Sequence, residues 1–96
     1  MFVIKSVNNI PIRISDERLK HVYVNHPEMK TQLKRIIETI EKPELITKGD
    51  SGEVLAIKHF NKSPVTNNKY LIVVYKELSL DGFLITAYYT RQYNQN

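Results

Sequence analysis

The run YLIVVY at 70–75 puts apolar side chains on both faces of a β-strand. Successive side chains of a strand point to opposite faces, so a run of this kind needs cover on both sides and is typical of a central strand. Two further apolar runs, EVLAIKHF at 53–60 and GFLITAYYT at 82–90, flank it along the chain. The Asp81–Gly82 step is a strong hairpin signal. These runs predict a three-stranded antiparallel meander.

Two helices are expected before this meander. Ser15 or Asp16 suits the N-cap of the first, whose buried stripe follows at helical spacing: Leu19, Val22, Tyr23 and His26. Pro27 disfavours helical geometry at the residue before it, so this helix should stop near Asn25 or His26 and a second should begin at Pro27. The second carries its own apolar stripe, Met29, Leu33, Ile36, Ile37 and Ile40, and ends at Lys42–Pro43.

The N-terminal segments 1–7 and 10–14 read as extended, with Pro11 placing the second at a sheet edge or in a lead-in. ELIT at 44–47 reads as a short extended connector. The predicted fold class is α+β, with the two N-terminal helices packed on an antiparallel sheet of about four strands. A chain of 96 residues has room for one core, so residues 1–96 are expected to form a single domain.

Charge and motif content narrow the function classes. The net charge of +4 permits a polyanionic partner such as RNA. The chain has no cysteine, which excludes disulfides and thiolate metal sites, and its three histidines lack a HExxH spacing. No metal and no cofactor are therefore expected. No apolar stretch approaches the length that crosses a bilayer. The expected location is the cytoplasm, without membrane contact.

Histidine carries most of the candidate chemistry, because its pKa lies near working pH. His26 ends the apolar stripe of the first helix and begins the second, where backbone N–H groups favour an anion. It acts either as an acid or base or as a packing residue at a helix end. His21 lies on the polar side of the first helix, facing substrate or only solvent. The two converge only if the helix breaks between them.

The strands supply the remaining candidates. Lys58 and His59 are neighbours and point to opposite faces, and Lys58 shares its face with apolar residues. In the last strand, Leu84, Thr86, Tyr88 and Thr90 are expected on one mixed face, with Phe83, Ile85, Ala87 and Tyr89 on the core face. Arg91 follows where a phosphate clamp is useful. Whether Tyr75 shares the Tyr88 face depends on the register.

Several segments resemble the small phage- and prokaryote-associated domains of the barnase–EndoU–colicin–RelE nuclease superfamily. They are RLKHVYVNHPEM, KPELI, VLAIKHF, KYLIVVYKE and DGFLITAYYTR, which span about residues 18–91. The resemblance implies a metal-independent endoribonuclease of toxin or effector type, often paired with a protein antitoxin. It also implies a site built from a helix-borne histidine and from basic or hydroxyl residues of the central and last strands.

Two functions follow as expectations. In the first, the domain cleaves RNA by transesterification: His26 or His21 acts as acid or base, Lys58 and Arg91 hold phosphate, and Thr86 and Thr90 donate hydrogen bonds. Tyr88 stacks on or positions a base, with Tyr75 beside it if the register allows. In the second, the same scaffold is a non-catalytic module that binds RNA or a protein. Convergence of a histidine with two cations would favour the enzyme.

Overall fold

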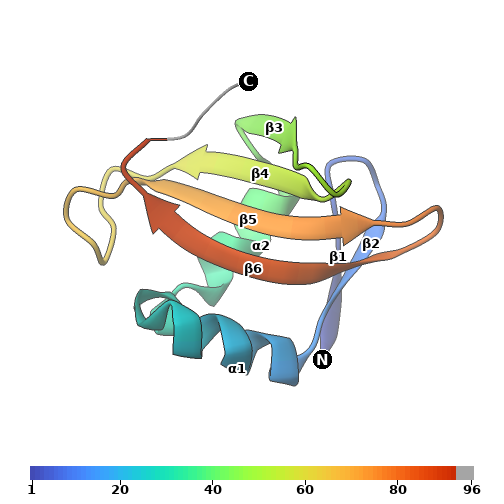
Figure 1. Cartoon of the computed structure of the whole chain (residues 1–96), viewed down its shortest axis with the longest axis horizontal. Coiled ribbons are helices and arrows are strands. Elements are labelled where there is room, and N and C mark those ends of the chain that lie inside the picture. Colours follow the sequence, from blue (N-terminus) through green and yellow to red (C-terminus); the bar gives the residue numbers. More distant parts are fainter. Residues whose placement is uncertain (93–96) are drawn as a thin grey trace.

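Six strands of the chain form one mixed sheet in the order β1-β2-β6-β5-β4-β3 (Figure 1). The computed structural model describes residues 1–92. Its elements are β1 (Phe2–Lys5), β2 (Pro11–Ile14), α1 (Asp16–Asn25), the short 3-10 helix η1 (Pro27–Thr31), α2 (Leu33–Glu41), β3 (Leu45–Lys48), β4 (Val54–His59), β5 (Tyr70–Glu77) and β6 (Gly82–Thr90).

The α+β class and the antiparallel β4-β5-β6 meander are confirmed, but the predicted strand count and order are wrong. The predicted extended connector at 44–47 overlaps β3 (Leu45–Lys48), which extends the sheet by pairing with β4. At the other side, β2 runs parallel to β6 through the pairs Ile12↔Gly82 and Arg13↔Phe83. The strands β2 and β3 have only four residues each. Their pairing depends on partner strands that the residue pattern of such a short segment does not reveal.

The first helix begins and ends where its sequence signals place it. The Ser15 hydroxyl accepts a hydrogen bond from the Arg18 backbone N–H at 3.1 Å, which caps α1. The second predicted helix is not continuous, because η1 and α2 are separated at Gln32. There the Tyr89 hydroxyl donates to the Gln32 side-chain oxygen at 2.7 Å. This contact with β6 holds the break, and it involves a residue 57 positions away.

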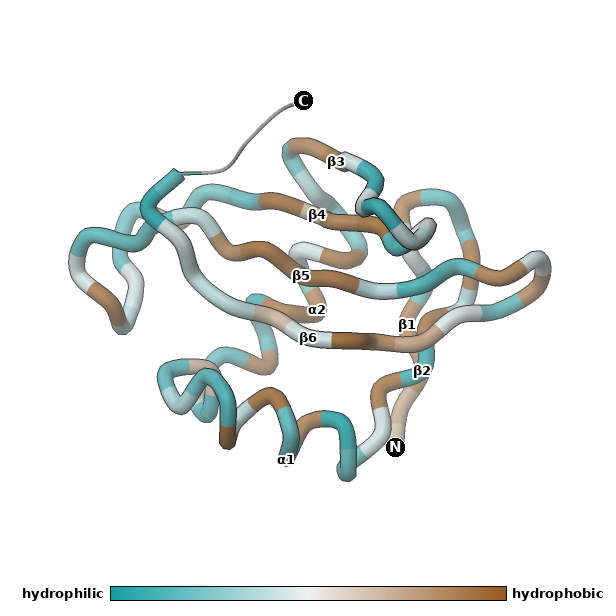
Figure 2. Tube along the Cα trace, in the orientation of Figure 1, coloured by the Kyte–Doolittle hydropathy of each residue, from teal (hydrophilic) through white to brown (hydrophobic). Residues whose placement is uncertain are grey.

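The two faces of the sheet have different surroundings. The main core lies on one face, where α2 packs behind β4 and β5 and α1 runs along β6 (Figure 1). The other face carries a smaller apolar cluster built from strand residues alone, and we call it the open face. No described helix crosses in front of β4, β5 and β6 in that view. Figure 2 shows the hydrophobic residues gathered along the middle of β4 and β5.

A β-bulge changes the predicted faces of the last strand. Val74 pairs with Thr86 while the next residue, Tyr75, pairs with Leu84, so Ile85 is the extra residue. A bulge adds one residue to one strand and shifts the alternation beyond it. Ala87 and Tyr89 face the core as expected, but Leu84 also joins the core and Ile85 joins the open-face cluster. The predicted faces of these two residues are therefore wrong.

Candidate functional site

The His26 ring lies against the Tyr88 ring at one side of the open face. Their centroids are 5.5 Å apart with an interplanar angle of 31°. His26 follows the last residue of α1 with non-helical dihedrals, φ −136° and ψ 79°, and this bend carries its side chain toward β6. Both residues are partly buried. The helix-borne histidine and the last-strand tyrosine of the sequence prediction are thus in contact.

A second pair of rings continues across the face. His59 pairs with Tyr70 across β4 and β5, and their ring centroids are 5.1 Å apart in an edge-to-face arrangement. Tyr70 pairs with Thr90 and Ile72 with Tyr88, so the two tyrosines are diagonal neighbours on adjacent strands. Diagonal neighbours on one face lie about 7–8 Å apart, within reach of aromatic side chains. We call these four rings the aromatic row: His26, Tyr88, Tyr70 and His59.

An apolar floor supports the aromatic row. Ile57, Ile72 and Val74 are only 2%, 4% and 8% exposed. The apolar side chains that cover them belong to the strands themselves, because the described helices pack on the other face. Tyr70 and Tyr88 pack against this cluster and remain partly exposed. Rings held on a packed floor lose little conformational freedom when a flat ligand covers them. The row is therefore a preformed stacking surface.

Two threonines flank Tyr88 along β6, and two cations lie next to the Tyr70–Thr90 pair. Thr86 and Thr90 lie on the open face with Tyr88, as the sequence predicts, because they pair with Val74 and Tyr70. The Thr90 hydroxyl donates to the Gln92 carbonyl oxygen at 2.8 Å. Lys69 precedes Tyr70 and Arg91 follows Thr90, and both side chains are exposed. Since Tyr70 and Thr90 are paired, the two cations lie next to each other along the chain ends of β5 and β6.

Lys58 lies on the opposite face of the sheet. Its ammonium forms an ion pair with Glu38 at 3.2 Å and donates to the Lys42 carbonyl oxygen at 2.8 Å. Lys42 is the C-cap of α2, where a cation complements the helix dipole. The structure thus gives this lysine a role in holding α2 on the sheet and separates it from His26 and Tyr88.

The two candidate histidines do not share a site. His21 is exposed on the outer side of α1, beside Glu17, Lys20 and Val24. His26 lies against β6. The helix does end at Asn25, but η1 has only five residues, and the Met29 N–H donates to the His26 carbonyl oxygen at 2.9 Å. The expected anion site at the start of a second long helix is not formed.

The register places Tyr75 away from Tyr88. It is fully buried on the core face, so it has no access to a ligand on the open face. Its hydroxyl has no hydrogen-bond partner among the residues that the structure describes, and the nearby Ser6 hydroxyl donates to Glu77. Burial, followed by the charge of Glu77, raises the pKa of Tyr75 to about 12.

We expect Tyr75→Phe to keep or slightly increase the free energy of unfolding at neutral pH, because an unpaired buried hydroxyl costs about 1–3 kcal/mol. The raised pKa means that the folded state retains the phenol proton that the unfolded chain releases near pH 10. This contribution is present below about pH 10 and is lost as the pH rises toward about 12. Urea unfolding across that range should show a shallower decline for the variant.

Tyr89→Phe is the matched control for this prediction. The Tyr89 hydroxyl donates to Gln32 and accepts from the Arg35 guanidinium at 3.0 Å. Burial raises the pKa of Tyr89, and Arg35 lowers it in part. Loss of these bonds should destabilise the protein by about 1 kcal/mol or more at neutral pH. Equal destabilisation by Tyr75→Phe and Tyr89→Phe would contradict the unpaired state of the Tyr75 hydroxyl.

Sequence reasoning missed half of the aromatic row. From the sequence alone, Tyr70 is assigned only to the central strand, and His59 is said only to point away from the face of Lys58. The available signal was alternation: His59 shares its face with Ile57, and Tyr70 with Ile72. What the alternation does not supply is the register that pairs His59 with Tyr70.

Within residues 1–92, no three histidine, aspartate or glutamate side chains gather as a metal site requires. None of the described helices has the length and apolar character needed to cross a bilayer. Comparisons with protein-family models, with curated proteins and with solved structures found no match to this chain. Membership of the nuclease superfamily therefore stays a prediction from the sequence motifs, and the functional argument rests on the open face.

Proposed function

We propose that this protein binds single-stranded RNA on the open face of its sheet, as a non-catalytic module. The observation that carries the proposal is the aromatic row, which spans β4, β5, β6 and the end of α1 on a face that no described helix covers. Unpaired bases stack on aromatic side chains displayed by a sheet, and this is a common way for proteins to hold single-stranded RNA.

The charges around the row support a phosphate backbone as the second half of the ligand. Lys69 and Arg91 flank the Tyr70–Thr90 pair, and the whole chain carries a net charge of +4. The Thr86 hydroxyl shares the face, and hydroxyls of this kind hydrogen-bond base edges or sugars.

RNA cleavage is the second candidate function, favoured by the contact between His26 and Tyr88. It would place an imidazole beside a stacked base. Cleavage also needs a second proton-transfer group and cations at the phosphate. The second histidine of the row, His59, is separated from His26 by Tyr88 and Tyr70. Lys58 is on the other face and paired with Glu38, and His21 is on the outer side of α1. Binding therefore accounts for more of the site than catalysis does.

One experiment tests both functions. Short labelled single-stranded RNA, and the same RNA annealed to its complement, are titrated with the protein in EDTA, and binding is followed by fluorescence anisotropy. We expect the single strand to bind more tightly, because only unpaired bases reach the rings, and to remain intact on a gel. Equal affinity for the duplex, or no binding at about 10⁻⁴ M protein, the weak end of non-specific binding, would contradict the proposal. Metal-free cleavage would establish the second candidate instead.

A further inference from the structure

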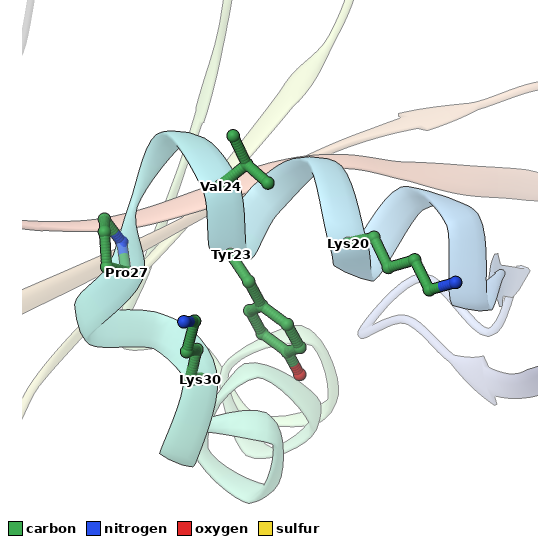
Figure 3. A pocket seen from close by; sticks show the side chains of 5 residues that line it. All are labelled: Lys20, Tyr23, Val24, Pro27 and Lys30. Atoms are coloured by element: carbon green, nitrogen blue, oxygen red, sulfur yellow. The ribbon is translucent and has the colours of Figure 1, made fainter.

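Two adjoining hollows lie along the outer side of α1, away from the open face. The larger, of about 440 Å³, lies between α1 and η1, and its lining residues are Lys20, Tyr23, Val24, Pro27 and Lys30 (Figure 3). The second, of about 310 Å³, is lined by Glu17, Lys20, His21 and Val24. The hollows share Lys20 and Val24, so together they form one groove along the helix, which we call the α1 groove.

The walls of the α1 groove are apolar. Val24 is 78% exposed in its middle, and the Tyr23 ring and Pro27 complete the larger hollow. Tyr23 is partly buried, and burial raises the pKa of its phenol. In Figure 3 the Tyr23 ring lies between the side chains of Lys20 and Lys30. An exposed apolar patch with a polar rim is a mark of an interaction site.

The charges on the rim of the α1 groove indicate which sign of charge a partner should carry. Lys20 and Lys30 are both exposed and border the larger hollow, whereas the acidic residue of the groove, Glu17, borders only the smaller one. Opposite charges across an interface favour the correct partner and disfavour the wrong one. The groove therefore matches an occupant that is apolar in its centre and acidic near Lys20 and Lys30.

The length of the α1 groove favours a peptide over a small molecule as its ligand. The ten residues of α1 span about 15 Å, at 1.5 Å per residue. Each hollow has room for a side chain. The α1 residues that line the second hollow precede those of the first by three or four positions, so the two hollows are about one helical turn apart. Apolar residues at i and i+4 of a helix have the same spacing, about 5–6 Å. An amphipathic helix that inserts such residues into a groove is a recurring mode of peptide recognition.

We propose that the α1 groove docks an acidic amphipathic helix of a partner protein. Two apolar side chains of that helix, at i and i+4, occupy the two hollows. Carboxylates beside them lie over Lys20 and Lys30, and the end of the helix near Glu17 carries no acid. This interaction is independent of the aromatic row, because the two surfaces share no residue.

The test is an NMR titration of the ¹⁵N-labelled 96-residue chain with a short synthetic helix. The probe carries leucines at i, i+4 and i+7 and glutamates on the flanks of this stripe, and a second probe has glutamine in place of glutamate. We expect the acidic probe to shift the amide signals of Lys20, Tyr23, Val24 and Lys30, and to bind more tightly than the glutamine probe. If the amide signals at these positions do not shift at about 1 mM probe, the proposal is overturned.

Variants separate the groove from net charge. Lys20→Glu with Lys30→Glu should weaken binding of the acidic probe about tenfold or more. Lys5→Glu with Lys48→Glu, at exposed positions of the outer strands β1 and β3, makes the same change in charge and should leave binding within about twofold. Val24→Asp removes the shared apolar wall at an exposed position that folding does not need. Equal weakening by the two charge variants, or an unchanged affinity for Val24→Asp, would overturn the proposal.

RNA is the alternative occupant that the same samples detect. If single-stranded RNA shifts the groove signals and Lys20→Glu with Lys30→Glu abolishes RNA binding, the groove belongs to the RNA path and the peptide proposal is overturned. If RNA shifts only residues around Tyr70 and Tyr88, the two surfaces are separate as proposed. A failure of RNA binding alone leaves the groove titration fully interpretable, so the two proposals fail independently.

Discussion

Tyr88→Ala should lower the affinity for single-stranded RNA between about fivefold and about a hundredfold, because one base–aromatic stack contributes about 1–3 kcal/mol. Tyr88 lies in the aromatic row between His26 and the diagonal neighbour Tyr70. It is only partly buried, and its ring lies outside the main core. The variant should therefore remain folded, which circular dichroism and thermal unfolding can establish. Binding is measured by anisotropy with the same labelled oligonucleotide.

Tyr88→Phe is the matched control, since it keeps the ring and removes only the hydroxyl. We expect its affinity to stay within about twofold of the wild type, because stacking depends on the π-face. If folded Tyr88→Ala binds RNA as tightly as the wild type, the open face is not the RNA surface. If instead the protein cleaves RNA, His26→Ala should slow cleavage by about a hundredfold or more, the usual scale for a lost acid or base.

Ile36→Ala should reduce the free energy of unfolding by about 2–5 kcal/mol, measured by urea unfolding followed by circular dichroism. Ile36 is fully buried on α2 and belongs to the main core between that helix and the sheet. Small domains have a total stability of about 5–15 kcal/mol, so this loss is a large part of it. The cost has two sources, the lost transfer free energy of the removed methyl and methylene groups and the cavity that they leave.

The neighbouring Ile37→Ala is the control with identical chemistry. Ile37 is only partly buried on the same helix, so its truncation removes less contact and leaves no closed cavity. We expect its cost to be less than half that of Ile36→Ala. Equal costs for the two substitutions would mean that α2 does not present Ile36 to the sheet as described.

Local signals determined where the regular elements lie. Ser15 caps α1 through its own side chain, and Pro27 stops the helix at the residue before it, so both ends depend on neighbours within a few positions. The run at 70–75 gave β5 for a similar reason, since apolar side chains on both faces indicate a central strand. The broken second helix is the exception, because its break at Gln32 is held by a hydrogen bond from distant Tyr89.

The candidate site was only half predictable. His26, Tyr88, Thr86 and Thr90 were identified from residue type and alternation, and the structure places them on or beside one face. Lys58 was identified because it is a charged residue among apolar residues on one face of β4. A lysine at such a position can bind a ligand, or it can form an ion pair within the protein. Here it pairs with Glu38 and the end of α2. These two roles can be told apart only when the position of α2 relative to β4 is known.

Local sequence signals are enough to predict the α+β class, both ends of the first helix, the three long strands and the alternation that puts Tyr88 with Thr86 and Thr90. These properties depend on neighbours within one or two turns or on strand parity. The parallel pairing of β2 with β6, the bulge at Ile85 and the register that aligns His59, Tyr70 and Tyr88 emerge only in the packed fold. Register follows from the packing of both sheet faces at once, since a slip of one residue would turn every side chain to the other face.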